Sequence, residues 1–447
     1  MEKFDVFVFG SGSAGQGVAK ECAKHGLKVA IIDKREYGGV CSLRGCDPKK
    51  LVLAPVQAYH AAQNLKSKGL KGSIEIDWRE ALQHAREYTN GKPRATREDL
   101  KEAGITCLEG QAKFVGPHTV DLDGKHIQAD HFVIATGMKT MQLDIPGEEH
   151  MVDYEQFFEL ENPPKEILFV GAGYISMEFG NMLSRAGSKI TIIEKGPHIL
   201  SPFEPYCADK IEEAAANAGI NIVKQADVKE VVKNGADDYT VIYKKDGAEF
   251  KVESNLVFNC SGRVPQIDQL GLDKINLETA DAGIKVNNRL QSVTHSHIYA
   301  CGDVSSKHIP LTPLSSREAV TVAKNLKGEP ATIDIDIIPS AAFTFPECAS
   351  VGMTEHDALD QNKSIEVIEK DASGFYNLKR VNGECYAFKL IVEKGTENLL
   401  GAHIVGPDAA EQINLFALAM KAGMTMTQFE DNIFTYPSWG NDLLSLR

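Results

Sequence analysis

The chain opens with a strand, a glycine-rich turn and a helix in immediate succession. Residues 4–9 are a short run of β-forming side chains that ends in the turn Gly10-Ser-Gly12-Ser-Ala-Gly15. A helical pattern follows the turn, and a second apolar run ends at Asp33. Glycines at these positions let the backbone approach a pyrophosphate, and the helix N-terminus offers it unpaired N–H groups. The segment therefore predicts a dinucleotide-binding βαβ unit, in which Asp33 accepts hydrogen bonds from a ribose.

The same unit occurs a second time. Residues 167–170 lead into the turn Gly171-Ala-Gly173, and a following apolar run ends at Glu194. Twenty-three residues separate the first glycine from the acid in each copy. Ser176 stands where the first unit has its third glycine, which crowds the helix slightly against the strand and leaves the phosphate positions intact. Two such units on one chain predict an α/β protein with two Rossmann-like domains.

Further strands and turns follow each copy. Apolar strands end at Ala135-Thr136-Gly137, Gly262 and Gly302-Asp303, and hairpin turns are expected at Asp123-Gly124 and Asp246-Gly247. Beyond about residue 334 the pattern changes: runs at 365–370, 387–393 and 399–405 predict strands of an antiparallel sheet, and 409–422 predicts an amphipathic helix. A domain without a ligand motif is a candidate for an oligomer interface.

Length, charge and cysteine content restrict the classes of function. A chain of 447 residues accommodates about three domains. Its 62 acidic and 48 basic residues give a formal charge of -14, which argues against a general binder of nucleic acid or anionic membranes. The sequence contains no signal-peptide pattern and no run of ~18 apolar residues, so we expect a cytoplasmic protein that does not span a membrane. Nine cysteines spread over this length argue against a secreted disulfide framework.

Two of these cysteines stand in a distinctive segment that begins at Gly38. Cys41 and Cys46 lie five residues apart and are followed by Lys49 and Lys50 at the start of a helical run. A helix N-terminus and neighbouring lysines lower the pKa of a thiol and favour the thiolate. We therefore predict a redox pair here and interpret the other seven cysteines as inert, because none has a partner at a useful spacing. No second cysteine or histidine pair accompanies them, so we predict no metal site.

Taken together, these motifs resemble those of the flavoprotein disulfide reductases, which include glutathione reductase, dihydrolipoamide dehydrogenase and mercuric reductase. The resemblance covers nearly the whole chain and includes Gly262-Arg263-Val-Pro265, Gly302-Asp303-Val304, Leu311-Thr312-Pro313 and the segment 401–406. It implies two Rossmann-like domains plus a C-terminal α+β dimerisation domain. The FAD-binding domain would comprise residues 1–150 and 267–335, the NAD(P)-binding domain 151–266, and the dimerisation domain 336–447.

The resemblance also implies a role for each matching residue. Cys46 would lie against the flavin as the charge-transfer thiolate, and Cys41 would be the exposed thiol that meets the substrate. Lys49 would pair with Glu178 beside the flavin N5, and Tyr174 would cover the flavin until nicotinamide displaces it. Asp33 would bind the adenosine ribose of FAD and Asp303 its ribityl chain. The remaining implied cofactor contacts are Gly10, Gly12, Gly15, Lys50, Ala135, Thr136, Gly137, Gly171, Gly173, Glu194, Gly262, Arg263, Gly302 and Thr312.

The acid of the second unit bears on the choice of nicotinamide nucleotide. A carboxylate at Glu194 suits a 2′-hydroxyl and repels a 2′-phosphate, for which an arginine is the usual partner. Residues 195–203 contain no arginine, unlike NADPH-using relatives. We therefore expect NADH, while Lys195 and His198 leave NADPH open.

The C-terminal segment departs from the family pattern. Disulfide-reducing relatives carry a His-Pro segment followed by Glu, a pair that the partner subunit supplies and that shuttles protons to the leaving thiolate. Here Tyr436 occupies the histidine place and Asn441 the glutamate place. An unperturbed tyrosine has a pKa of ~10 against ~6.5 for histidine, so it is a poor general base near neutrality. Mercuric reductases also place tyrosine there, but they carry a C-terminal cysteine pair that this sequence lacks.

These observations predict a homodimeric FAD enzyme that passes electrons from NADH through the flavin and a Cys41–Cys46 disulfide to an acceptor. The acceptor is either a disulfide or small thiol-reactive substrate, with Tyr436, Asp442 or water as proton donor, or a metal ion or quinone that needs no histidine. Two other classes stay open: a non-catalytic flavoprotein redox sensor, and a monooxygenase or quinone reductase without cysteine chemistry. The complete set of cysteine, lysine and glutamate motifs argues against both.

Overall fold

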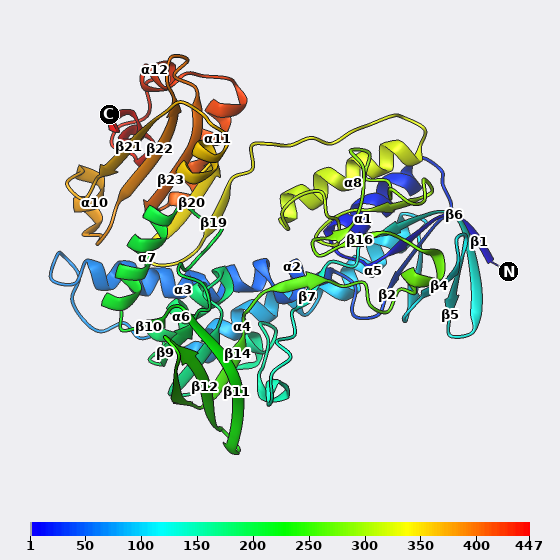
Figure 1. Cartoon of the computed structure of the whole chain (residues 1–447), viewed down its shortest axis with the longest axis horizontal. Coiled ribbons are helices and arrows are strands. Elements are labelled where there is room, and N and C mark those ends of the chain that lie inside the picture. Colours follow the sequence, from blue (N-terminus) through cyan, green and yellow to red (C-terminus); the bar gives the residue numbers. More distant parts are fainter. Residues whose placement is uncertain (1) are drawn as a thin grey trace. The chain divides into compact units, whose positions relative to one another are not determined.

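The computed structural model describes residues 2–447 and divides into two compact units. One unit contains the chain up to Val52, Glu80–Met141 and Arg263–Asp334. The other contains Leu53–Arg79, Gln142–Gly262 and Ile335–Arg447. Each unit is built around its own sheets (Figure 1). Which cofactor each predicted segment of the chain binds stays a prediction.

A seven-stranded sheet forms the centre of the first unit. Its parallel part contains, in order, β3 (Thr106–Glu109), β2 (Val29–Asp33), β1 (Glu2–Phe9), β6 (Lys125–Ile134) and β18 (Ile298–Ala300). An antiparallel pair, β4 (Lys113–Gly116) and β5 (Thr119–Leu122), continues the sheet beyond the first half of β6. Phe7 and Val8 on β1 are fully buried, as expected for a parallel strand covered on both faces.

Helices pack around this sheet, and several of them carry predicted site residues. The helices of this unit include α1 (Ser13–Lys24), α2 (Gly39–Arg44), α5 (Lys92–Glu102), α8 (Thr312–Leu326) and the first residues of α3 (Cys46–Asn64). Figure 1 shows α1 and α8 side by side. A Cβ atom on Gly17 would lie 2.9 Å from the Cβ of Ala319, so glycine permits this close approach.

The second unit contains a smaller parallel sheet and an antiparallel hairpin sheet. The parallel sheet has the order β10 (Asn221–Val223), β9 (Lys189–Ile193), β8 (Glu166–Val170) and β14 (Leu256–Asn259). The antiparallel sheet consists of β11 (Ala226–Gly235), β12 (Asp238–Lys245) and β13 (Ala248–Ser254). Helix α6 (Tyr174–Arg185) connects β8 to β9, and α7 (Pro205–Asn217) precedes β10.

The second unit also contains the C-terminal sheet, which is antiparallel as predicted. Its order is β19 (Ser340–Ala342), β20 (Glu347–Gly352), β23 (Leu399–Gly406), β22 (Ala387–Glu393) and β21 (Ile365–Asp371). Helix α11 (Ala409–Lys421) packs against β20 and β23. Phe388, Ile404 and Phe416 are fully buried between them. The strand and helix predictions for this part of the chain are therefore confirmed.

Shorter elements complete the fold. The short strands are β7 (Met138–Thr140), β15 (Arg263–Pro265), β16 (Thr279–Ala280) and β17 (Gly283–Ile284). The remaining α-helices are α4 (Trp78–Thr89), α9 (Glu355–Asp360), α10 (Tyr376–Val381), α12 (Met426–Glu430) and α13 (Trp439–Asp442). The 3₁₀ helices are Glu148–His150, Gln156–Glu159, Leu272–Ile275 and Leu443–Ser445.

Both predicted hairpins form at the expected turns. Asp123 and Gly124 join β5 to β6 with φ of 51° and 81°, and Asp246 and Gly247 join β12 to β13 with φ of 50° and 78°. Two consecutive positive φ values identify the turn type that matches the twist of a hairpin, and this explains the Asp-Gly sequence at both places.

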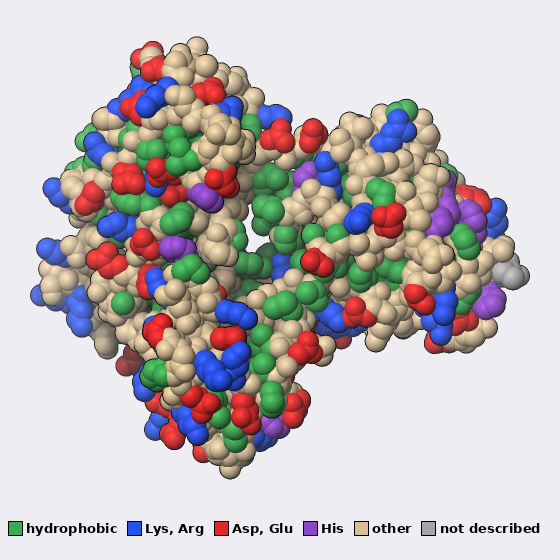
Figure 2. Space-filling view, in the orientation of Figure 1, with side chains coloured by type: hydrophobic (Ala, Val, Ile, Leu, Met, Phe, Trp, Pro, Cys, Tyr) green, Lys and Arg blue, Asp and Glu red, His purple; other side chains and the backbone are tan. Residues whose placement is uncertain are grey.

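The surface mixes charges of both signs. On the face drawn in Figure 2, Lys and Arg side chains lie among Asp and Glu side chains. Across residues 2–447, no helix combines the length and apolar character needed to cross a bilayer.

Candidate active site

The two glycine turns have the same backbone geometry. Gly10 has φ +95°, and a Cβ atom there would lie 2.4 Å from the carbonyl oxygen of Ala135. Gly171 has φ +97°, and a Cβ atom there would lie 2.4 Å from the carbonyl oxygen of Cys260. In each unit the turn therefore presses against the end of a neighbouring strand, where only glycine fits. The repeated sequence motif thus gives the same close backbone contact in both units.

The acids Asp33 and Glu194 are both hydrogen-bonded to their own glycine turn. Asp33 Oδ2 accepts from the N–H of Ser11 at 2.8 Å and from its hydroxyl at 2.6 Å. Glu194 Oε2 accepts from the N–H of Ala172 at 2.6 Å, and its Oε1 accepts from the N–H of Gly196 at 2.6 Å. Each carboxylate is thus fixed at the carboxyl end of its strand, where a ligand of an open α/β sheet binds.

The first unit has space for a nucleotide next to Asp33. A cavity of about 600 Å³ lies at the end of β2, and its lining includes Asp33, Arg35, Arg97 and Lys101. The hydroxyl oxygen of Thr136, in the strand end that faces Gly10, is buried without a hydrogen-bond partner among the described residues. A cavity of this size and an unsatisfied buried hydroxyl fit a bound dinucleotide such as FAD.

Asp303, predicted to contact the ribityl chain, lies in the same unit. It lies three residues beyond the end of β18, and its Oδ2 lies 3.4 Å from Nη1 of Arg263. Burial raises the pKa of the Asp303 carboxyl above its usual value, although the Arg263 guanidinium opposes that shift. The structure therefore brings together two predicted FAD contacts, Asp33 and Asp303, and the predicted cofactor contact Arg263 within one compact unit.

The predicted redox cysteines lie next to each other. Cys41 is in α2, Cys46 is the first residue of α3, and their thiols hydrogen-bond to one another. The hydroxyl of Thr312, at the start of α8, donates to Cys41 Sγ at 3.1 Å. Cys46 is exposed and Cys41 is partly buried, the reverse of the order of exposure that the family resemblance implies. The proximity of the two thiols suits a pair that opens and closes a disulfide.

One expectation about these cysteines is wrong. The segment predicted lowered thiol pKa values, yet the pKa of Cys41 is raised. The hydrogen bond with the Cys46 thiol is the main cause and burial is the second, while the Thr312 hydroxyl acts in the opposite direction. In a dithiol the second proton leaves against the charge of the first thiolate. The neighbouring thiol and burial therefore favour the protonated form of Cys41.

The predicted residues of the second unit are ordered around α6. Tyr174 is the first residue of this helix and is 42% exposed, and Glu178 on the next turn is buried. Glu178 Oε1 accepts from the backbone N–H of Phe343 at 2.9 Å. Lys49 and Lys50 belong to the first unit, so the proposed ion pair between Lys49 and Glu178 stays a prediction.

The C-terminal segment that contains Tyr436 packs partly onto its own domain. Tyr436 is 71% exposed. Trp439 packs edge-on against Tyr386, with ring centroids 5.3 Å apart, and lies beneath the Arg380 guanidinium. Asp442 is buried, and both its oxygens accept from Asn377 Nδ2 at 3.0 Å. Within the described chain, Trp439 and Asp442 therefore act in packing the tail onto its own domain.

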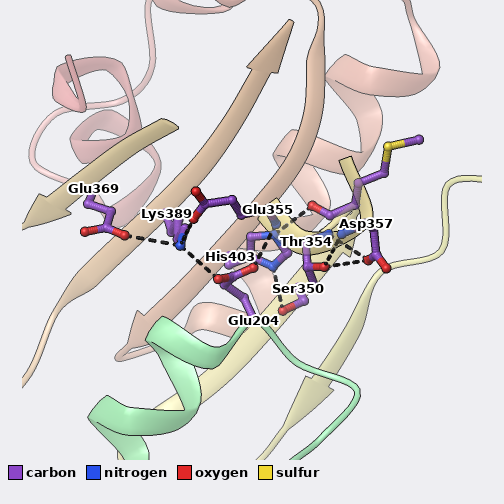
Figure 3. A network of polar contacts seen from close by, with 9 residues as sticks. Glu204, Ser350, Thr354, Glu355, Asp357, Glu369, Lys389 and His403 are labelled. Atoms are coloured by element: carbon purple, nitrogen blue, oxygen red, sulfur yellow. Dashed lines mark hydrogen bonds and ion pairs between the residues drawn. The ribbon is translucent and has the colours of Figure 1, made fainter. Parts of the chain in front are cut away.

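His403, the last histidine in the sequence, is fully buried and both its nitrogens have partners. Nδ1 lies 3.0 Å from Ser350 Oγ, and Nε2 lies 3.0 Å from the carbonyl oxygen of Met353 (Figure 3). Burial lowers the pKa of this imidazole. It is therefore placed for structure and not as a substitute proton donor.

Next to His403, a buried lysine that sequence reasoning missed joins several elements. Lys389 on β22 has ion pairs of 2.9 Å to Glu204, 2.6 Å to Glu355 and 3.2 Å to Glu369 (Figure 3). Its side chain is 6% exposed. A lone Lys inside an apolar strand offers no local signal, because its three partners come from distant parts of the sequence.

The other seven cysteines have the environments of inert thiols. Burial raises the pKa of Cys22 to about 12 and that of Cys385 to about 11. Cys207 and Cys348 are neighbours in space, which their sequence spacing concealed, and a hydrogen bond between them raises the pKa of Cys207. Among the described residues, no group of three or more His, Cys, Asp or Glu side chains is arranged to hold a metal ion.

Comparison with known proteins agrees with this geometry. The sequence profile described as "Pyridine nucleotide-disulphide oxidoreductase" matches residues 4–319, and the dimerisation-domain profile of the same family matches residues 338–445. Glutathione reductase of Nostoc sp. is 28% identical over 458 residues, covering 99% of each chain. Mercuric reductase of Staphylococcus aureus is 29% identical over 450 residues, covering 97% of this chain and 80% of that relative.

Solved structures lead to the same family. The HOCl-induced flavoprotein disulfide reductase RclA of Escherichia coli superposes with a TM-score of 0.87 at 26% identity, and its Cu(II) complex with a TM-score of 0.88 at 27% identity. Both matches cover 99% of each chain. With its dithiol, its two glycine turns and its dimerisation domain, the chain belongs to the pyridine nucleotide-disulphide oxidoreductases and is an FAD-dependent NAD(P)H oxidoreductase.

Proposed function

We propose that the enzyme takes hydride from NADH and passes the electron pair through FAD to a disulfide between Cys41 and Cys46, which then reduces an acceptor. The observation that carries this proposal is the contact between the two thiols, next to the α8 residue Thr312. Bound FAD supplies the step that converts a hydride into an electron pair for the disulfide. NADH, one proton and the disulfide give NAD⁺ and two thiols, so charge and atoms balance.

Within this proposal, Cys46 is the thiolate that interacts with the flavin and Cys41 is the thiol that meets the acceptor. The raised pKa of Cys41 supports this order, because it disfavours a thiolate at Cys41. The hydrogen bond from Thr312 and the partial burial of Cys41 favour the reverse order. The two assignments make opposite predictions for single serine variants.

NADH is proposed as the reductant because of Glu194. Both carboxylate oxygens accept backbone N–H groups, which holds the negative charge where a 2′-phosphate would lie. The adjacent Lys195 is drawn to Asp227, at 3.5 Å. With its carboxylate held by the backbone, and Lys195 paired with Asp227, Glu194 is expected to repel a 2′-phosphate.

A metal ion is the second candidate acceptor. Its support is the exposed Tyr436 in the place of the proton-shuttling histidine, together with the similarity to RclA, of which a Cu(II) complex is known. Reduction of a metal ion transfers electrons without protonating a leaving thiolate, so it does not need that histidine. Turnover of NADH with glutathione disulfide, a quinone, Cu(II) and Hg(II) separates the candidates. Turnover with the metal ions but not with glutathione disulfide or the quinone would reject a disulfide as the acceptor.

The redox role of the pair is tested by spectroscopy. Mixing the anaerobic holoenzyme with NADH is expected to produce the long-wavelength absorption of a thiolate-to-flavin charge-transfer complex. Cys46→Ser is expected to lose this band, and Cys41→Ser to keep it. Cys385→Ser, at a cysteine remote in sequence with a raised pKa, is the matched control and should behave like the wild type.

Three results would contradict the proposal. A band that survives in Cys46→Ser but disappears in Cys41→Ser reverses the two roles. A band that survives in both variants rejects the cysteine assignment. Quinone turnover retained in the double serine variant shows a reductase that does not use cysteine chemistry.

A further inference from the structure

A histidine and a glutamate form a buried pair in the first unit, which is the proposed FAD-binding unit. Neither residue belongs to a predicted site motif. His308 Nδ1 lies 2.7 Å from Glu318 Oε1, and the two side chains are 6% and 3% exposed. His308 belongs to the loop before α8, and Glu318 lies on the second turn of that helix. A side chain of α8 thus contacts the loop that precedes the helix.

The second oxygen of Glu318 holds the backbone in front of Asp303. Glu318 Oε2 accepts from the N–H of Gly302 at 2.6 Å. Gly302 has φ +74°, and a Cβ atom there would lie 3.1 Å from the Cβ of Ala14, so the turn is enclosed between α1 and α8. Asp303, the proposed ribityl contact, is therefore oriented by a backbone that Glu318 fixes.

The same loop ends at the redox pair. Four residues after His308, the hydroxyl of Thr312 donates to Cys41 Sγ. The segment from Gly302 to Thr312 thus carries the proposed flavin contact at one end and the cysteine contact at the other. The His308–Glu318 pair restrains it between these two points.

The polar contact through which the His308 side chain can restrain this segment is the one to Glu318. Its Nε2 is buried without a hydrogen-bond partner among the described residues. A buried imidazole nitrogen left unsatisfied costs free energy, so packing alone gives no reason for a histidine at this position. The hydrogen bond between Nδ1 and Glu318 is the polar contact that this side chain contributes.

We propose that His308 and Glu318 are a pair of positioning residues that hold the Gly302–Thr312 segment so that Asp303 meets FAD and Thr312 meets Cys41. This proposal rests on the proposed role of Asp303. Hydrogen bonds to a charged group are the stronger kind, and the pair contributes two of them at one carboxylate. Glu318 is the link through which the effect of His308 passes.

The test measures FAD affinity by titrating apoprotein with FAD and following flavin fluorescence. Glu318→Ala is expected to weaken binding about tenfold or more, because it removes both hydrogen bonds. His308→Ala is expected to weaken it less. The double variant His308→Ala/Glu318→Ala should match Glu318→Ala alone, since His308 acts through the carboxylate.

Two substitutions of His308 separate positioning from general packing. In His308→Asn the amide nitrogen lies near the place of Nδ1 and can still donate to Glu318, whereas in His308→Gln it lies near the place of Nε2. The His308→Asn variant is therefore expected to retain FAD affinity and the His308→Gln variant to lose it. Thr321→Val, at a buried position of α8 where the hydroxyl donates to the carbonyl oxygen of Arg317 and to neither member of the pair, is the control and should bind FAD like the wild type.

The melting temperature of each apoprotein is measured in parallel. The positioning role predicts that the stabilisation gained on adding FAD shrinks in Glu318→Ala. A lower melting temperature of the apoprotein with an unchanged increase on adding FAD would overturn the proposal. Additive effects on FAD affinity in the double variant, or equal FAD affinities of His308→Asn and His308→Gln, would also overturn it. These measurements involve no turnover, so a missing charge-transfer band in the wild type would count against the proposed function alone.

Discussion

At the scale of single residues, the two acids of the βαβ units perform two tasks. Asp33 and Glu194 accept hydrogen bonds from their own glycine turns, which fixes the turns, and they place a negative charge where a ribose is expected. The first task is visible only in the structure. The second follows from the spacing of the motif.

Glu194→Gln should weaken the preference for NADH over NADPH. The amide oxygen can still accept a backbone N–H, but the charge that repels a 2′-phosphate is gone. The ratio of kcat/KM for NADH to that for NADPH is expected to fall by about tenfold, a change of ~1.4 kcal/mol. Steady-state kinetics with both nucleotides measures it. Glu166→Gln, at the start of β8, is the control, and an unchanged ratio in Glu194→Gln would reject the role of the charge.

At the scale of elements, α3 places the ring of His60 among side chains of the second unit, where protonation of the imidazole is disfavoured. The ring of His60 lies 4.9 Å from that of Phe345, and the Arg185 guanidinium lies 4.2 Å from the same Phe345 ring. Burial, and secondly the charge of Arg185, lower the pKa of His60 from 6.5 to about 4. Folding therefore favours the neutral imidazole.

The sign of the pH dependence follows from this shift. Between pH 6.5 and about 4 the unfolded chain binds a proton at His60 that the folded chain does not. The contribution of His60 to stability is full above pH 6.5 and is lost as the pH falls towards 4. The melting temperature of the wild type should fall as the pH is lowered over this range, and the melting temperature of His60→Gln should fall less. His25→Gln, at a histidine near the surface, is the control, and equal pH profiles for all three proteins would contradict the prediction.

At the scale of the whole molecule, the C-terminal domain exposes apolar side chains. Ile433 is 96% exposed, Tyr436 71% and Leu418 66%. All three lie in the part of the chain that matches the dimerisation-domain profile. Apolar groups gathered on one domain are the expected mark of a subunit interface. We therefore propose that a second copy of the chain covers them.

Ile433→Glu should weaken the dimer. The substitution places a charge in the apolar part of the proposed interface, where it cannot be solvated. Sedimentation at a series of protein concentrations is expected to show a dissociation constant raised by about tenfold or more. Val293→Glu, at a 52% exposed position of the first unit, is the control. A dimer of wild-type strength in Ile433→Glu, or a monomeric wild type, would contradict the prediction.

By itself the sequence determined the two βαβ units, their hairpins, the antiparallel C-terminal sheet and the cysteine pair. Each of these is announced by a local signal: a glycine turn after an apolar strand, an Asp-Gly turn, alternating strands, or two thiols in one short segment. Only the tertiary structure decided the contact of Thr312 with Cys41, the pair of His308 with Glu318 and the three carboxylates around Lys389. The separation in sequence is 271 residues for Thr312 and Cys41 and 10 residues for His308 and Glu318, and in each case only folding brings the two side chains together. For the same reason the raised pKa of Cys41 ran against expectation, because the neighbouring thiol and burial outweigh the helix end and the lysines that the sequence displays.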